Sequence, residues 1–304
     1  MGATVRQLRP AGAVRLADAI NAYLATISHA ESKGTHRVYA GVLSALRARF
    51  GEDTDMTALA PQAVTEWFTG QWGTVAPSTW NVRRAALRSA AGWWAEQGWT
   101  ATDPAGMIRR RKTAPDRDRA LSRAQVERLL TDEKIPLRER TLWRMLYESA
   151  ARSAEVLRLN VEDLDLPNRR ARVRRKGGAV DVIVWQTGTA RLLPRLLNGR
   201  KTGPLFVTER RTRLELSPAD LDEHRRARLS YERAEQLFKA ATGGATLHQL
   251  RHSALSHDAE EGTSTPMLMA RSGHTSVRSL AKYARVSPEA LARHQAERDP
   301  ARRG

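Results

Sequence analysis

Residues 246–257 read TLHQLRHSALSH, and residues 272–284 read SGHTSVRSLAKYA. Half of the eight histidines of the chain lie between His248 and His274 in these two stretches, and Tyr283 is the only tyrosine after His248. Histidines gathered in this way are typical of either a metal site or a site that binds an anion. These two kinds of site support different chemistry, so the function of the chain depends on which of them is present.

A metal site fits these residues poorly. His248 and His252 are spaced i and i+4 on one face of a helix, as in zinc proteases, but those enzymes have a catalytic glutamate directly after the first histidine. Gln249 occupies that position here, and an amide cannot accept a proton. No third ligand is evident in the sequence, and Arg251 would bring a cation next to the metal. We therefore expect no metal and no other cofactor.

Phosphate chemistry fits the same residues better. His248 and Arg251 are three residues apart and share a helix face, and the planar guanidinium of Arg251 suits phosphate oxygens. His274 follows a glycine at a possible helix start, where its imidazole is a further donor to the anion. The phenol of Tyr283 has an ordinary pKa near 10, and neighbouring cations favour its ionised, nucleophilic form.

The composition of the chain agrees with a polyanionic partner. The 304 residues carry a formal net charge of +18, which favours nucleic-acid binding, although a solvated basic surface is the alternative. The absence of cysteine excludes disulfides, thiolate chemistry and cysteine-based zinc sites. The sequence has no secretory signal and no apolar run of about 20 residues, so we expect a cytoplasmic, nucleoid-associated protein without membrane contact.

The hydrophobic periodicity divides the chain into two domains. Residues 14–99 predict helices only, which makes residues 1–108 an all-α domain. Residues 109–119 are charged and aperiodic, and we interpret them as a linker, with a basic loop inside one domain as the alternative. Residues 120–304 are mostly helical but contain an alternating stretch at 170–184, which predicts a β-hairpin and a small β-sheet. The second domain is therefore α+β, and it ends in a predicted helix over 288–298.

The motifs resemble those of a known family. H-x-x-R, then G-H, then a tyrosine nine residues later resembles the C-terminal box of tyrosine recombinases, the phage integrase family. SAARSAEVLRLNVEDLD resembles the first arginine box of that family, although Ala150 and Ala151 replace its usual glycine. RRKGG resembles the catalytic lysine turn, and PSTWNVRRAALRSAAGWW followed by DP is similar to the SAM-like helical DNA-binding domain. The resemblance covers residues 14–290.

The resemblance implies DNA cleavage by transesterification, without metal or ATP. It assigns the candidate catalytic residues as Arg152, Lys176, His248, Arg251, His274 and Tyr283, with Glu155 supporting the first arginine. Tyr283 would attack the phosphodiester, Lys176 would protonate the leaving 5′-oxygen, and His248 would position the tyrosine or accept its proton. The product would be a 3′-phosphotyrosyl link. Other roles stay open: Arg152 as an ion-pair partner of Glu155, Lys176 as a backbone contact, and His248 as a helix cap.

The resemblance also implies a double-stranded DNA partner in a C-shaped clamp of the two domains. Basic residues near the predicted DNA path are the candidate contacts: Arg83, Arg84, Arg88, Arg109, Arg110, Arg111, Lys112, Arg174 and Arg175. Four protomers would act on two DNA sites, with the C-terminal tail docked on a neighbouring protomer. Two rival functions use the same fold, namely type IB topoisomerase activity and DNA binding without catalysis.

Overall fold

The computed structural model describes residues 14–30, 33–113, 120–175, 178–280 and 288–299. The chain divides into two compact units, residues 1–115 and 116–304. Two of the predicted catalytic residues, Lys176 and Tyr283, lie outside the described residues. Within the described residues, no helix is long and apolar enough to cross a bilayer.

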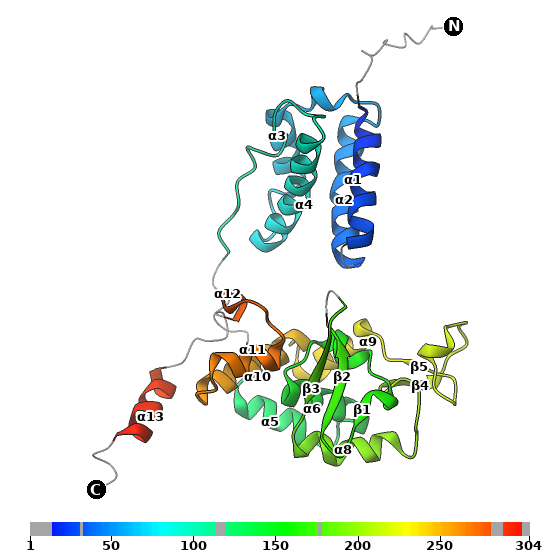
Figure 1. Ribbon diagram of the computed structural model, residues 1–304, viewed down its shortest axis with the longest axis vertical. Helices are drawn as coiled ribbons and strands as arrows, with labels where there is room; N and C mark the ends of the chain where they lie inside the picture. The colour runs from blue at the N-terminus through cyan, green and yellow to red at the C-terminus, as the bar shows by residue number, and fades with distance from the viewer. Residues whose placement is uncertain (1–13, 31–32, 114–119, 176–177, 281–287, 300–304) are drawn as a thin grey trace. The chain divides into compact units, whose positions relative to one another are not determined.

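The first unit is helical, as its periodicity predicts. Its helices are α1 (Leu16–Ala30), α2 (Lys33–Phe50), α3 (Pro61–Trp72) and α4 (Pro77–Glu96), with a short 3-10 turn, η1 (Met56–Ala58) (Figure 1). Pro61 and Pro77 each lie in the first turn of their helices, where a missing N–H costs nothing. The N-cap of α4 is Ala76.

The core of the first unit is rich in aromatic side chains. The Phe68 ring packs edge-on against Trp72 and Trp80, with both centroid distances at 4.7 Å. The buried indole of Trp94 donates to the carbonyl of Ala19 at 3.0 Å and so ties α4 to α1. Apolar packing with a few indole hydrogen bonds therefore holds this unit together.

The beginning of the predicted linker packs on α4. The Trp80 indole donates to the Arg109 carbonyl at 2.9 Å, and Asn81 makes two hydrogen bonds to the backbone of Arg111, at 2.8 and 2.9 Å. The Arg111 guanidinium lies 3.7 Å from the ring centroid of Trp80. Residues 109–111 are therefore part of the first unit, although they lack any hydrophobic periodicity.

The second unit is mostly helical, as predicted, and it contains two small antiparallel sheets, of which the sequence predicts the one with the 170–184 hairpin. Its helices are α5 (Arg123–Thr131), α6 (Leu137–Ser149), α7 (Ser153–Leu157), α8 (Thr187–Leu197), α9 (Tyr231–Thr242), α10 (Leu247–Glu260), α11 (Thr265–Ser272), α12 (Val277–Leu280) and α13 (Pro288–Arg298). Its strands are β1 (Leu164–Asp165), β2 (Arg170–Arg174), β3 (Val180–Val184), β4 (Val207–Arg211) and β5 (Arg226–Arg228). The predicted C-terminal helix over 288–298 is confirmed.

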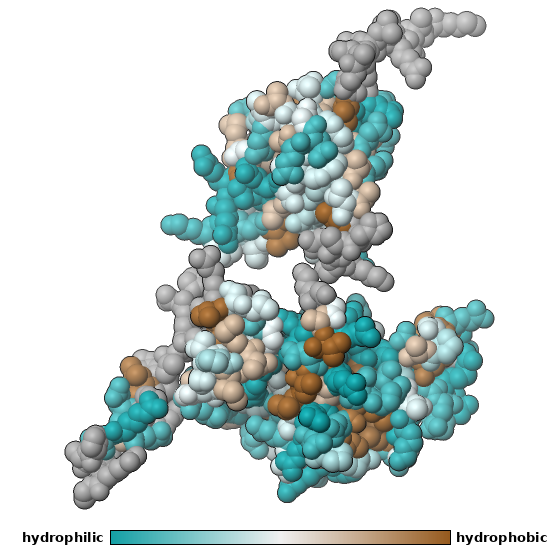
Figure 2. Space-filling model, in the orientation of Figure 1, coloured by the Kyte–Doolittle hydropathy of each residue, from teal (hydrophilic) through white to brown (hydrophobic). Residues whose placement is uncertain are grey.

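The predicted β2–β3 hairpin is confirmed. The valines of β3 point away from the core. Ala171 and Val173 of β2 are buried, and they pair with Ile183 and Asp181 of β3, respectively. Successive residues of a strand point to opposite faces, so the residues of β3 that alternate with Asp181 and Ile183 point to the solvent. Val180, Val182 and Val184 are accordingly exposed, and Figure 2 shows a hydrophobic patch over these strands.

Helix α6 runs through the core of the second unit. Trp143 is fully buried on it and packs edge-on against Phe238 of α9, with ring centroids 5.4 Å apart. At the end of α6, the buried carboxylate of Glu148 accepts the backbone N–H groups of Gln186 and Thr189, at 2.9 and 3.1 Å. This satisfies donors at the start of α8, which would otherwise be orphaned in the interior.

Candidate active site

The junction between α6 and α7 positions Arg152. Ala150 ends α6 in the left-handed conformation, with φ of 50°, at a position where glycine is usual. Arg152 then becomes the N-cap of α7, and its backbone N–H donates to the carboxylate of Glu155 at 3.0 Å. Its guanidinium Nη1 donates to the other oxygen of the same carboxylate at 2.8 Å. The Arg152 side chain remains 38% exposed, so Glu155 orients it without burying it.

The start of α10 positions Arg251. Thr246 and Gln249 form a reciprocal capping box, so the side chain of Gln249 is used to cap the helix. Arg251, one turn further along, is only 3% exposed. Its Nη1 donates to the carbonyl of Ala150, and its Nη2 donates to the carbonyl of Ser272 at 2.6 Å. Arg251 therefore joins α10 to the α6–α7 junction and to the end of α11.

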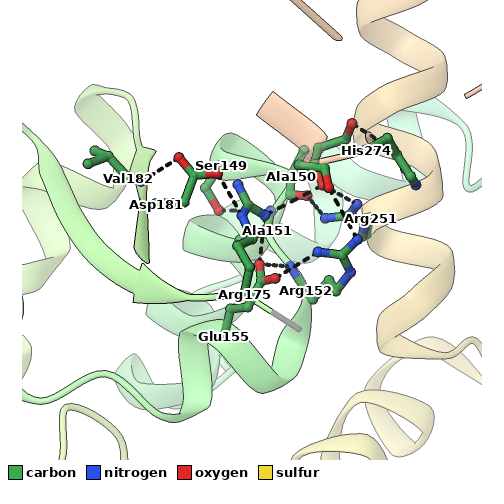
Figure 3. Close-up of polar contacts among 12 residues, drawn as sticks. Ser149, Ala150, Ala151, Arg152, Glu155, Arg175, Asp181, Val182, Arg251 and His274 are labelled. Atoms are coloured by element: carbon green, nitrogen blue, oxygen red, sulfur yellow. Dashed lines mark hydrogen bonds and ion pairs between the residues drawn. The ribbon is translucent and has the colours of Figure 1, made fainter. Parts of the chain in front are cut away.

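The end of α11 brings His274 to the same place. Gly273 terminates the helix in the left-handed conformation, with φ of 61°. His274 follows, and its Nδ1 lies 2.7 Å from the hydroxyl of Ser272. Nη2 of Arg152 donates to the Gly273 carbonyl at 3.5 Å. Three of the six candidate catalytic residues thus converge around residues 272–274, and Figure 3 shows the cluster.

Of the other three candidate catalytic residues, only His248 lies within the described residues. His248 is exposed on α10, although it lies only three residues before the buried Arg251. The residues flanking the lysine turn, Arg175 and Gly178, are joined by a backbone hydrogen bond of 3.0 Å. Helix α12 ends at Leu280, close in sequence to Tyr283. The catalytic roles of these three residues stay predictions.

Arg175 differs from the exposed DNA contact that we expected. Its side chain is only 8% exposed, and its Nη1 donates to Glu155 at 3.0 Å. Its Nε donates to Asp181 of β3 at 2.8 Å. In the sequence, RRARVRRK has the composition of a solvated basic run, and the acidic residue that follows it, Asp181, is the signal that could have indicated a buried arginine.

The other predicted DNA contacts fall into three groups. Arg84 donates to the Ile108 carbonyl at 2.6 Å, and Arg111 donates to the Gly73 carbonyl at 2.8 Å, so both support the fold of the first unit. Arg88 forms a half-exposed ion pair with Asp103 at 2.8 Å. The remainder are exposed or partly exposed: Arg83, Arg109, Arg110, Lys112 and Arg174. For all of these residues, DNA contact stays a prediction.

The two other histidines of α10 are structural. His252 and His257 are buried, and Nδ1 of His257 lies 2.7 Å from the hydroxyl of Tyr147. Burial, together with the nearby cation of Arg123, lowers the pKa of His257. Burial also raises the pKa of Tyr147. In the part of the chain that the structure describes, no group of three or more histidine or acidic side chains is arranged to hold a metal ion.

Comparison with known proteins agrees with this arrangement. The model of the phage integrase family matches residues 119–290. Tyrosine recombinase XerC of Mycobacterium sp. (strain KMS) is 28% identical over 303 residues, which cover 93% of this chain and 97% of the relative. Tyrosine recombinase XerC of Mycobacterium tuberculosis (strain ATCC 25177 / H37Ra) is 28% identical over 290 residues, covering 89% and 93% of the two chains.

Solved structures share the fold. The Tn1549 transposon integrase in complex with circular intermediate DNA aligns with a TM-score of 0.69 at 16% identity, over 94% of this chain and 99% of that one. A lambda integrase dimer bound to a COC′ core site aligns with the same TM-score of 0.69 at 16% identity, over 90% and 78% of the two chains. The chain belongs to the phage integrase family and is a site-specific DNA recombinase of the tyrosine class.

Proposed function

We propose that Arg152, Arg251 and His274 bind one backbone phosphate of duplex DNA and that Tyr283 attacks its phosphorus. The convergence of these three side chains at residues 272–274, from segments far apart in the chain, is the observation that carries the proposal. The guanidinium of Arg152 has five N–H donors, and its contacts to Glu155 and Gly273 use two nitrogens, so donors remain for phosphate oxygens.

The proposed reaction is a balanced transesterification. The Oη of Tyr283 forms a bond to phosphorus, and the bond from phosphorus to the 5′-oxygen breaks. His248 positions the phenol or accepts its proton, and Lys176 donates a proton to the leaving 5′-oxygen. The product is a 3′-phosphotyrosyl ester and a free 5′-hydroxyl, so the ester bond is conserved and strand joining needs no ATP.

The arginines act on the charge that develops in the transition state. Negative charge grows on the non-bridging oxygens as Tyr283 attacks, and fixed donors aimed at such oxygens contribute about 3–4 kcal/mol each in comparable sites. The buried carboxylate of Glu155 holds Arg152 in place before DNA arrives. This preorganisation lets the cations act without a metal ion.

The assembly on DNA is proposed to be a homotetramer on two sites. A lambda integrase tetramer bound to a Holliday junction aligns with this chain at a TM-score of 0.67 and 16% identity, over 90% of this chain and 83% of that one. The formal charge of +18 suits a polyanionic partner. Helix α13 (Pro288–Arg298) is the segment that we propose to dock on a neighbouring protomer during integration, excision or resolution of DNA.

A nicked suicide substrate tests the chemistry. Footprinting first identifies the bound DNA site, and a duplex of that sequence is then nicked next to the cleavage position, so that the cut end diffuses away. We expect the full-length protein to form a covalent adduct with this DNA and the Tyr283→Phe variant to form none. Tyr231→Phe is the matched control, since Tyr231 is a half-exposed tyrosine of α9.

Three outcomes contradict the proposal. An adduct that persists in Tyr283→Phe would assign the nucleophile elsewhere. A shifted DNA complex without any adduct in the unmodified protein would indicate a non-catalytic binder. Relaxation of plasmids that lack the recombination site would indicate a topoisomerase.

A further inference from the structure

Arg175 stands directly before the lysine turn and closes its base. Its backbone N–H donates to the carbonyl of Ala179 at 2.8 Å, and its own carbonyl accepts from Gly178 at 3.0 Å. Lys176 follows Arg175 directly in the chain. A residue that fixes Arg175 therefore restrains the turn that carries the proposed general acid.

One acidic residue of α7 and one of β3 hold the guanidinium of Arg175. Its Nη1 donates to one carboxylate oxygen of Glu155, at 3.0 Å, while the other oxygen of Glu155 accepts from Arg152 at 2.8 Å. Its Nε donates to Asp181, on the opposite strand of the hairpin, at 2.8 Å. One buried carboxylate is thus shared by Arg152 and Arg175, as Figure 3 shows.

Arg175 also lies against the end of α11, at Ser272 and Gly273. Its Nη1 is 3.5 Å from the Ser272 carbonyl, which accepts from Arg251 at 2.6 Å. A Cβ placed on Gly273 would lie 2.5 Å from Nη1 and 2.7 Å from Nε of Arg175, closer than real atoms approach. A side chain at Gly273 would therefore displace the guanidinium of Arg175, and the positive φ of Gly273 also favours glycine.

We propose that Arg175 is a positioning residue, which fixes the Lys176 turn to the carboxylate and the carbonyl that also hold Arg152 and Arg251. Protonation of the leaving 5′-oxygen then depends on Arg175, although Arg175 does not contact the reacting atoms. The inference rests on the proposed role of Lys176 as the general acid. It goes further, because it assigns the alignment of that lysine to a buried ion-pair network.

A sulfur substitution in the DNA separates this role from a purely structural one. When the bridging 5′-oxygen at the cleavage site is replaced by sulfur, the leaving group is a thiolate with a pKa of about 8.5, and it departs without a proton. A defect in proton donation therefore disappears on this substrate. A defect in binding the phosphate, or in folding, remains.

We expect Arg175→Ala to slow single-turnover cleavage of ordinary DNA by about 10–100-fold, less than complete loss of a general acid. On the 5′-thio substrate its rate should be close to that of the unmodified protein. Lys176→Ala should show the same selective rescue. Arg170→Ala is the matched control, since Arg170 lies on β2, the strand that precedes Arg175, and forms an exposed ion pair with Asp165 at 2.8 Å; this variant should be unaffected on both substrates.

Asp181→Asn is a milder variant in case the loss of Arg175 prevents folding. Asp181 is 45% exposed, so its substitution leaves the Glu155 pair intact and weakens only the contact across the hairpin. We expect a slowing of about tenfold or less on ordinary DNA, again absent on the 5′-thio substrate.

The outcomes distinguish the two proposals. Equal slowing of Arg175→Ala on both substrates, or no slowing on ordinary DNA, would overturn the positioning role while leaving the general acid in place. If Lys176→Ala itself were not rescued by sulfur, the general-acid assignment would fail, and the inference about Arg175 with it. Loss of the adduct in Tyr283→Phe reports on the nucleophile alone.

Discussion

The two units of the chain differ in whether they bury polar and charged side chains. Among the described residues, every buried polar or charged side chain lies in the second unit, from Glu139 to Ser272. The same is true of every described non-glycine residue with positive φ: Ala150, Arg169, Asn198 and Arg225. In the first unit the buried side chains are aliphatic or aromatic, and Arg83 and Arg111 lie over the rings of Trp72 and Trp80.

Stability is given up in the unit that carries the catalytic residues. Burying an ion pair carries a desolvation cost of about the same size as the attraction between its charges, and strained backbone costs further free energy. The first unit avoids both and is a packed platform. The second unit accepts both close to Arg152, Arg175 and Arg251, where fixed cations are needed to bind phosphate. The second unit should therefore respond to changes of charge to which the first unit is indifferent.

The largest expected effect is that of Glu155→Gln. This change leaves Arg152 and Arg175 without their shared negative charge, and breaking a buried pair in this way costs about 3–5 kcal/mol. The free energy of local opening in the second unit, measured by hydrogen exchange resolved along the chain, should fall by about 3 kcal/mol, and cleavage should slow at least about tenfold. Exchange in the first unit should be unchanged.

Glu127→Gln is the matched control for this experiment, since Glu127 is exposed on α5 of the same unit. It should change stability by no more than about 0.5 kcal/mol. A fall of equal size in both units, or a fall below about 1 kcal/mol in the second, would mean that the Glu155 network does not carry the charge of the site.

Much of this site is predictable from the sequence, because it depends on local patterns. The capping box at Thr246, the hairpin over 170–184 and the helix over 288–298 each follow from residues close together in the chain. The family motifs place Arg152, Arg251 and His274 together. Local patterns are sufficient wherever the deciding contacts are also local.

The remainder depends on contacts between distant residues. Arg175 pairs with Glu155, 20 residues away, and lies against Ser272, 97 residues away, and periodicity carries no information about either. The alternation of β3 is equally consistent with valines inside or outside, since a strand has two faces. Only its pairing with β2, where Ala171 faces Ile183, decides between them.

A smaller effect is expected from the buried Tyr147–His257 pair. Burial and the nearby Arg123 lower the pKa of His257 below its ordinary value of about 6.5. Between about pH 6.5 and the lowered pKa, the unfolded chain binds a proton that the folded chain does not. The unfolding free energy of the second unit should therefore fall as the pH falls below 6.5, by at most about 1.4 kcal/mol per pH unit.

His257→Asn should flatten this dependence, because asparagine offers an acceptor near Nδ1 to Tyr147 but does not titrate. Hydrogen exchange between pH 6.5 and about 5 measures the slope for each unit, after correction for intrinsic exchange rates, with the first unit as the internal reference. An unchanged slope in His257→Asn would show that another group titrates instead.

The smallest effect compares two strained positions of the second unit. Arg225 is exposed in the turn before β5, with φ of 58°, and Ala150 is fully buried, with φ of 50°. Glycine relieves about 1–2 kcal/mol of left-handed strain at either position but adds about 0.5–1 kcal/mol of unfolded-state entropy. Arg225→Gly should therefore gain about 0.5 kcal/mol, whereas Ala150→Gly also loses a buried methyl worth about 0.8 kcal/mol and should be close to neutral. Denaturant unfolding followed by hydrogen exchange measures both; a clear gain at Ala150 would mean that the strain beside Arg152 exceeds that of an ordinary turn.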